Sequence, residues 1–195
     1  MSRMVAGLLL AAGRGKRFDA SGQHNKLLAN VDGMAVARRT AIRLGEAVEQ
    51  RLAVVRPQSA ALRRELEAAG CLVTECADAD LGMGHSLAHG VGEAVRHFDP
   101  IAVVVMLADM PFIEAGTLRA LVALAGTPDV IAAPRYGGER GQPVLFGSGH
   151  FAALRRSSGD RGASHLLQQH PVTYLDVDDP GVLRDIDRPA DLAGR

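Results

Sequence analysis

Short apolar runs alternate with amphipathic stretches along most of the 195-residue chain. Continuous apolar runs of this length are typical of strands that are covered on both faces of a sheet. The predicted strands cover residues 5–11, 52–55, 71–76, 101–109 and 130–134. Between these runs, apolar residues recur at helical spacing. The predicted helices cover residues 34–48, 57–70, 87–98 and 115–125.

This alternation predicts an α/β fold, a Rossmann-like three-layer sandwich in which a mostly parallel sheet lies between helices. The pattern changes after Pro134. There, "RYGGERGQPVLFGSG" predicts a turn that leads into a strand of different orientation, an antiparallel element in the second half. Further on, "VTYLDVDDPGVLRDID" predicts two short strands around an Asp-Pro-Gly turn. We find no internal repeat, linker or low-complexity segment in the sequence and expect a single domain over residues 1–195.

The charges of the chain balance, because lysine and arginine together number 22 and aspartate and glutamate also number 22. A formal net charge of zero gives no whole-molecule field for nucleic acid or for an anionic membrane, so we expect neither as a partner. Any anion site must therefore be local, built from a few cations and backbone N–H groups.

The N-terminal run and the cysteines indicate the compartment. Residues 4–12 are apolar but too few to span a membrane, and no signal-peptide cleavage context follows them. Cys71 and Cys76 lie five apart on one predicted strand and form no C-x-x-C pair, so we expect reduced thiols rather than a bridge. Together these features predict a cytoplasmic protein.

Three segments follow predicted strands at the sheet edge where open α/β proteins bind ligands: residues 12–26, 77–86 and 108–112. In the first, glycines alternate with Arg14, Lys16 and Arg17, and Lys26 follows later. Phe18 stands at the third glycine position of a dinucleotide fingerprint, and the spacing does not fit a P-loop either. What remains is a flexible turn whose backbone N–H groups and cations suit an anion, or else a solvated surface turn.

The second segment contains Gly82, Gly84 and Ser86 at the start of a predicted helix. A helix N-terminus offers free N–H groups and a positive dipole end, which suit a phosphate or a polar base edge, although Ser86 can equally be the helix cap. His85 and His89 have the i, i+4 spacing of metal ligands. Because neither a glutamate nor a third ligand accompanies them, we expect capping or solvated histidines rather than a zinc site.

The third segment places Asp109 at the end of the most hydrophobic strand. A carboxylate there, close to a cationic loop, can hold Mg²⁺ against phosphate oxygens, while the alternative is a cap for the helix that follows. Later in the chain, Asp185 and Asp187 flank Ile186. If this segment is extended, we expect only one of the two carboxylates to face the site.

Six sequence motifs occur in one order along the chain: "LLLAAGRGKRF…NKLL", "LGMGHSLAHGV", "MLADMPF", "RGQPVLF", "GDRGASHLL" and "DIDRPADL". In this order they resemble the MobA-like nucleotidyltransferases, and within them most closely the molybdenum cofactor cytidylyltransferases, over residues 5–192. The eight residues between Arg17 and Lys26 make a longer loop than is common in that family. The "AAG" after the first strand resembles cytidyl-transferring members more than guanylyl-transferring ones.

The resemblance implies a nucleotide-diphospho-sugar transferase-like fold and an Mg²⁺-dependent transfer of CMP from CTP to a molybdopterin-type molybdenum cofactor, with release of pyrophosphate. It implies catalytic roles for Arg17, Lys26 and Asp109, and metal ligation by Asp109 and Asp187. The residues that it places at the nucleotide are Leu10, Ala11, Ala12, Gly13, Gly15, Arg17, Lys26, Gly82, Gly84 and Ser86.

Alternatives of the same class are transfer from another NTP, such as GTP, or to a sugar phosphate or another small phosphate acceptor. An alternative of a different class is a non-catalytic chaperone that binds nucleotide or cofactor and delivers the cofactor to a molybdoenzyme. In either case a transient contact with a molybdoenzyme is a possible partner interaction. A dinucleotide-dependent oxidoreductase is disfavoured, because Phe18 replaces the third glycine of its fingerprint.

Overall fold

The computed structural model describes residues 4–15, 17–19 and 24–193 of the chain. Lys16 and residues 20–23 of the predicted cationic loop therefore lie outside the described residues. All the strands and helices predicted up to residue 134 are present, with ends shifted by a few residues. They are β1 (Val5–Leu10), α1 (Val36–Gly45), β4 (Gln50–Val55), α2 (Ala60–Ala68), β5 (Leu72–Glu75), α3 (Met83–Phe98), β6 (Ala102–Leu107), α4 (Ala115–Val122) and β7 (Ile131–Tyr136).

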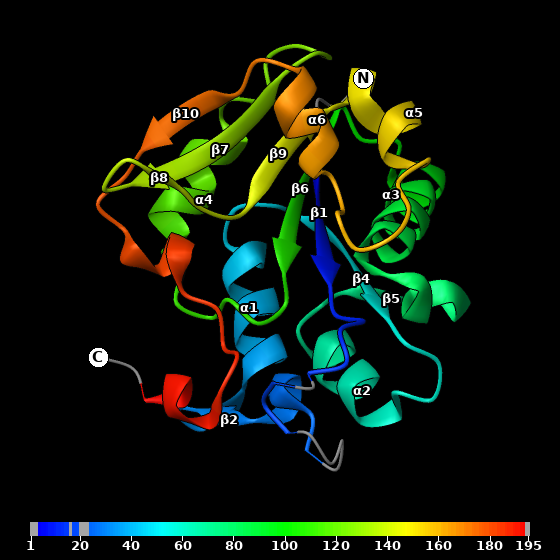
Figure 1. The fold of residues 1–195 in the computed structure, drawn as a ribbon, viewed down its shortest axis with the longest axis vertical. Helices are drawn as coiled ribbons and strands as arrows, with labels where there is room; N and C mark the ends of the chain where they lie inside the picture. Colours follow the sequence, from blue (N-terminus) through cyan, green and yellow to red (C-terminus); the bar gives the residue numbers. More distant parts are fainter. Residues whose placement is uncertain (1–3, 16, 20–23, 194–195) are drawn as a thin grey trace.

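Eight strands form the main sheet, in the order β10–β7–β9–β6–β1–β4–β5, with β8 paired to β7 (Figure 1). The additional elements are the strands β2 (Asn30–Val31), β3 (Met34–Ala35), β8 (Glu139–Arg140), β9 (Val144–Gly147) and β10 (Thr173–Asp176) and the helices α5 (Phe151–Leu154) and α6 (Ser164–Gln169). In the main sheet, β9 runs antiparallel to β6 and β7, and β8 antiparallel to β7, while the other pairs are parallel. The predicted mostly parallel sheet with an antiparallel element in the second half is confirmed.

Helices cover both faces of this sheet. Alternate side chains of the strands point to opposite faces, so neighbours such as Leu8 and Leu9 belong to different halves of the core. One half packs under α1, α2 and α4, and the other under α3, α5 and α6. A Cβ at Gly90 would lie 2.6 Å from Leu8 Cδ1, so the absence of a side chain there lets α3 approach β1 closely. None of the helices in the described ranges combines the length and apolarity needed to cross a membrane.

The prediction of a second short strand after β10 is wrong. The Asp-Pro-Gly sequence instead begins a 3-10 turn at Pro180–Leu183, capped by the side chain of Asp179. The buried Asp179 carboxylate also accepts hydrogen bonds from the Glu114 backbone N–H (2.9 Å) and the Thr117 hydroxyl (2.8 Å). Satisfying this carboxylate fixes the chain against the loop before α4, and this turn replaces the predicted strand.

Candidate functional site

A cavity of about 420 Å³ opens at the carboxyl ends of β1, β4 and β6. It is bounded by the loop after β1, the start of α3, the end of β6 and the C-terminal segment. This is the sheet edge that the sequence pattern indicated, because the carboxyl ends of parallel strands meet there. The residues of the sequence-based site that line the cavity are Leu10, Ala12, Gly13, Gly15, Arg17, Lys26, Gly82, Ser86, Asp109 and Asp187.

Three carboxylates, those of Asp109, Asp185 and Asp187, converge at one side of this cavity. One oxygen from each lies within 4.8 Å of the others, and among the described residues no other set of three or more His, Cys, Asp or Glu side chains meets this condition. His89 instead contacts the Thr74 hydroxyl through Nε2 at 2.8 Å.

The expectation that only one of Asp185 and Asp187 faces the site is therefore wrong. Residues two apart in an extended segment point to the same side, opposite to the residue between them. Ile186, the residue between them, is fully buried in the core, and its backbone N–H donates to the Asp109 carbonyl at 2.9 Å. This contact seats both carboxylates beside Asp109. Asp109 itself does not cap α4, whose N-cap residue is Glu114.

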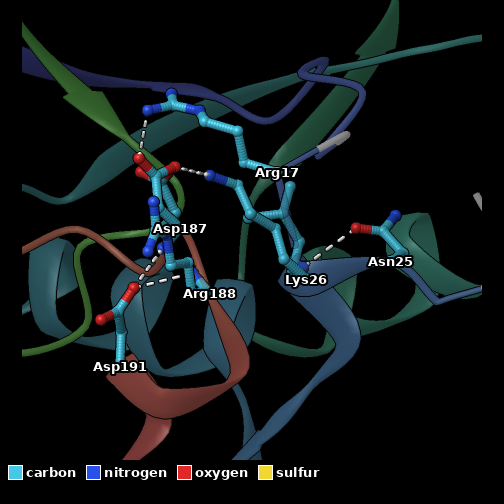
Figure 2. Close-up of polar contacts among 8 residues, drawn as sticks. Arg17, Asn25, Lys26, Asp187, Arg188 and Asp191 are labelled. Carbon is cyan, nitrogen blue, oxygen red and sulfur yellow. Dashed lines mark hydrogen bonds and ion pairs between the residues drawn. The ribbon is translucent and has the colours of Figure 1, made fainter. Parts of the chain in front are cut away.

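The ammonium of Lys26 lies among these carboxylates. Its Nζ is 2.6 Å from Asp109 Oδ2 and 3.1 Å from Asp187 Oδ1, and its side chain is 12% exposed. Burial lowers the pKa of Lys26, but attraction to Asp109 and the hydrogen bonds to Asp109 and Asp187 outweigh it, and the pKa is raised overall. Lys26 begins a short 3-10 turn that the Asn25 side chain caps by accepting from the Leu27 N–H (Figure 2). The cap sets the direction from which the lysine enters.

Arg17 approaches Asp187 from another direction, with its Nη1 2.5 Å from Asp187 Oδ2, while most of its side chain is exposed. Figure 2 shows Arg17 and Lys26 both reaching toward Asp187. On the other side of Asp187, the Asp191 carboxylate accepts from the backbone N–H groups of Asp187 (3.0 Å) and Arg188 (2.7 Å). These two bonds lower the pKa of Asp191 and hold the Asp187 backbone in place.

The acidic group keeps unused capacity to bind a cation. Asp109 Oδ1 is buried and has no hydrogen-bond partner among the described residues. The pKa of Asp185 is raised, first by burial and then by the neighbouring charges of Asp187 and Asp109. A group of carboxylate oxygens of this kind is the donor set that Mg²⁺ and Mn²⁺ prefer. The residues present therefore fit a hard divalent cation.

The loop between Arg17 and Lys26 is closed by a contact between its described ends. Asp19 Oδ2 accepts from the His24 backbone N–H at 2.8 Å and lies 2.9 Å from His24 Nδ1. Lys26, two residues after His24, lines the cavity, so the length of the loop does not remove it from the site.

A second group of charges, on the other side of the cavity, was missed in the sequence. Asp80 accepts a bidentate ion pair from Arg14 (3.0 and 2.7 Å) and also contacts the guanidinium of Arg56. Arg56 in turn donates to the Ala12 carbonyl at 3.3 Å, and its pKa is lowered by burial and by the nearby charge of Arg14. Together these contacts tie the glycine loop to the end of β4 and to the 3-10 turn Ala77–Leu81 that follows β5. The available signal was the position of Arg56 directly after a strand, at the ligand-binding edge.

The start of α3 makes a backbone contact that the sequence did not predict. Gly82 is the N-cap, so Ser86 lies inside the helix and does not cap it. The N–H of Gly84 donates to the Gly159 carbonyl at 2.7 Å, and a Cβ at Gly84 would lie 2.6 Å from the Ser158 backbone. Gly84 therefore receives the segment around residues 158–159, outside the cavity lining. Ala11, 2% exposed, likewise packs in the core rather than in the lining.

The chain is similar in sequence to a known protein over part of its length. A stretch of 117 residues is 37% identical to the purine catabolism protein PucB of Bacillus subtilis (strain 168), covering 58% of this chain and 56% of PucB. The match thus spans little more than half of that relative's length.

Solved structures resemble the chain over nearly its whole length. Rv0371c from Mycobacterium tuberculosis H37Rv has a TM-score of 0.81 at 26% identity, covering 98% of this chain and 96% of that one. A complex of Rv0371c with manganese gives 0.77 at 27% identity, covering 96% and 95%. A nucleotidyl transferase from Methanothermobacter thermautotroptrophicus (Mth528) gives 0.82 at 19% identity, covering 97% and 94%, a likeness of fold.

The family is shown by a match over most of the sequence. Residues 7–174 match the MobA-like NTP transferase domain, a range that includes the glycine loop, Lys26, the start of α3 and Asp109. The acidic residues 185 and 187 follow this range and complete the cavity. The chain belongs to the MobA-like NTP transferase family, whose members are nucleotidyltransferases.

Proposed function

We propose that this nucleotidyltransferase transfers CMP from CTP to a molybdopterin-type molybdenum cofactor in a reaction that depends on a divalent cation, Mg²⁺ in the first instance. The observation that carries the proposal is the convergence of three carboxylates and two cations, Lys26 and Arg17, in one strand-end cavity. The choice of CTP and of the cofactor is supported by the ordered motifs and by the "AAG" sequence that follows β1.

The proposed reaction requires no covalent intermediate with the protein. An oxygen of the acceptor phosphate attacks the α-phosphorus of CTP and forms the new O–P bond. The bond from the α-phosphorus to the oxygen that bridges it to the β-phosphorus breaks, and its electron pair leaves with pyrophosphate. Because two anions must meet, charge neutralisation and in-line positioning supply most of the rate enhancement.

Each part of the cavity has a role in this scheme. Asp109, Asp185 and Asp187 would hold the cation, and a bound divalent cation neutralises phosphate oxygens as a Lewis acid. The manganese complex of Rv0371c supports divalent-metal use in a protein of similar structure. Lys26 and Arg17 would stabilise the negative charge of the departing pyrophosphate.

The other side of the cavity would hold the nucleoside. The backbone of Ala12 and Gly13 lies there, held by Arg56 through the Ala12 carbonyl. A backbone edge of this kind can read the hydrogen-bonding pattern of a base without a dedicated side chain. Ser86, 4% exposed, adds a hydroxyl at the start of α3.

A panel of nucleotides and acceptors tests the proposal. The purified protein is incubated with CTP, GTP, ATP or UTP, with MgCl₂ or MnCl₂, and with molybdenum cofactor or simple sugar phosphates, and pyrophosphate release is measured. We expect release with CTP and molybdenum cofactor. Release only with another nucleotide or acceptor would reassign the substrate, and tight CTP binding without any release would favour a cofactor chaperone.

A further inference from the structure

The Lys26 ammonium occupies the position between Asp109 and Asp187 that a cation would need. We propose that Lys26 holds the place of the divalent cation, so that the metal enters the acidic group only as the lysine leaves it for the triphosphate. This inference rests on the proposed metal-dependent transfer and assigns Lys26 a second role, that of coupling metal binding to nucleotide binding.

The geometry supports direct competition between the two cations. The oxygens nearest to Nζ are Asp109 Oδ2 at 2.6 Å and Asp187 Oδ1 at 3.1 Å, one from each of two members of the acidic group. A hard divalent cation needs the lone pairs of the same carboxylates. Each lone pair that accepts from the Lys26 ammonium is one that a metal ion cannot use, so the two cations compete for Asp109 Oδ2 and Asp187 Oδ1.

The charges support the same coupling. Three carboxylates face two cationic side chains, Lys26 and Arg17, and Arg17 already pairs with Asp187. Adding a divalent ion while the lysine stays in place would bring the metal close to the ammonium beside Asp109 and Asp187, whose side chains are mostly buried, so solvent screens this repulsion only in part. A triphosphate removes this penalty, because it offers the lysine anionic partners elsewhere in the cavity.

Lys26 lines the cavity, so its ammonium has open space beside it into which it can swing. Gly15, with a φ of +62°, borders the stem of Lys26, and a Cβ built on it would lie 3.5 Å from Lys26 Cγ. The stem thus runs along the glycine loop that lines the cavity. The backbone stays fixed by the Asn25 cap, so we expect the ammonium to swing while the turn that carries it remains.

Binding of Mn²⁺ alone to the full-length protein tests the proposal. The affinity is measured without nucleotide, from the electron paramagnetic resonance signal of free Mn²⁺, for wild type and for Lys26→Met. If the lysine competes with the metal, the variant binds Mn²⁺ about tenfold tighter or more, which is within the range of measured site couplings. Equal or weaker binding by Lys26→Met would overturn the proposal.

Two control variants test whether the gain in Mn²⁺ affinity arises at the acidic group. Arg14→Met removes a cation that lines the same cavity but pairs with Asp80, so its Mn²⁺ affinity should equal that of wild type. The double variant Lys26→Met/Asp109→Asn should lose the added affinity. If the gain survives without Asp109, or if Arg14→Met shows the same gain, the effect is one of general charge and the proposal is rejected.

A stability readout covers the case in which Lys26→Met folds poorly. A ligand that binds the folded state more tightly raises the melting temperature by a larger amount. We therefore expect 1 mM MnCl₂ to raise the melting temperature of Lys26→Gln more than that of wild type. Equal shifts would contradict the proposal. Because neither measurement uses nucleotide or acceptor, a gain in metal affinity without any CMP transfer would keep this inference and reject the proposed function.

Discussion

The Lys26 ammonium and an Asp109 carboxylate oxygen lie 2.6 Å apart, although 83 positions separate the two residues in the sequence. The contact exists because β1 and β6 are parallel neighbours in the sheet, so the loop after β1 and the residues after β6 meet at one edge. We therefore expect substitutions at this contact to affect catalysis and nucleotide binding. Substitutions at other contacts of the cavity and the fold should affect binding or stability separately.

Asp109→Asn should abolish most of the transfer activity while the fold is retained. Asparagine preserves the shape of the side chain but removes one of three charges proposed to hold the cation, and we expect a loss of at least about a hundredfold in kcat. Pyrophosphate release measures the rate, and circular dichroism checks the fold. A rate close to that of wild type would remove Asp109 from the mechanism.

Lys26→Ala should weaken CTP binding at saturating metal. The change removes a charge-assisted contact to the triphosphate, for which we expect a loss of about 1.5–3 kcal/mol of binding free energy. Isothermal titration calorimetry gives the affinity directly. Arg43→Ala is a suitable control, because Arg43 forms an ion pair with Glu46 away from the cavity. If CTP binds both variants equally, the phosphate role of Lys26 is refuted.

Arg56→Gln should raise the KM for CTP and change kcat little. Arg56 holds the Ala12 carbonyl and Asp80 but does not touch the acidic group, so its loss should loosen the nucleoside side of the cavity. A lost hydrogen bond of about 1.5 kcal/mol corresponds to a roughly tenfold change. Steady-state kinetics separate KM from kcat, with Arg63→Gln, a surface ion-pair residue, as the control. A fall in kcat alone would place Arg56 in a different role.

Asp179→Ala should lower the free energy of unfolding by about 3 kcal/mol, because three donors, including the Gly181 N–H at 2.9 Å, lose a buried acceptor. Urea unfolding measures this loss. Asp176→Ala is the matched control, since Asp176 is exposed and its carboxylate pairs with the guanidinium of Arg135 at the surface. We expect the control to cost less than about 1 kcal/mol. Similar costs for both variants would contradict a positioning role for Asp179.

Cys71 should make stability fall as the solution becomes alkaline. Burial raises the pKa of its thiol from an ordinary 9.0 to about 11, although Arg51 opposes the shift. Between these values the unfolded chain releases the proton and the folded chain keeps it, so the free energy of unfolding declines by up to about 2–3 kcal/mol.

The measurement for Cys71 is a series of urea unfolding curves between pH 8 and pH 11. The control is Cys71→Ala, which lacks the thiol and should decline less over that range. Both cysteines are free and buried, so alkylation of the native protein at pH 8 should also be slow. Parallel pH profiles for wild type and Cys71→Ala would show that the thiol does not contribute.

Much of the sheet could be predicted because its strands are continuous apolar runs. Residues 101–109 are an example, since both faces of β6 are buried and no polar residue interrupts the pattern from 102 to 107. Lys26 and Asp109 follow two such strands, β1 and β6, and the carboxyl ends of parallel strands lie at one edge of a sheet. Their positions after predicted strands were therefore sufficient to place both residues at the ligand-binding edge, while the neighbouring order of β1 and β6 came from the structure.

Other parts depend on contacts that no local pattern encodes. The alternation in "VLRDID" suggested a strand, but the capped turn at Asp179 takes its place, and a single backbone bond from Ile186 to Asp109 brings in both later carboxylates. Gly82 and Gly84 looked like an anion site at a helix start. Their lack of side chains also admits the backbone around Gly159, a partner 75 residues beyond Gly84 that no local pattern indicates.

The most direct test of the proposed CMP transfer follows the phosphorus of CTP. The protein is incubated with molybdenum cofactor, divalent metal and CTP labelled with ³²P at either the α- or the γ-phosphate. We predict that the α label moves to the cofactor and the γ label appears in pyrophosphate, with neither movement in Asp109→Asn. An unlabelled cofactor, with α-labelled CTP recovered intact at saturating metal, would contradict the proposed transfer.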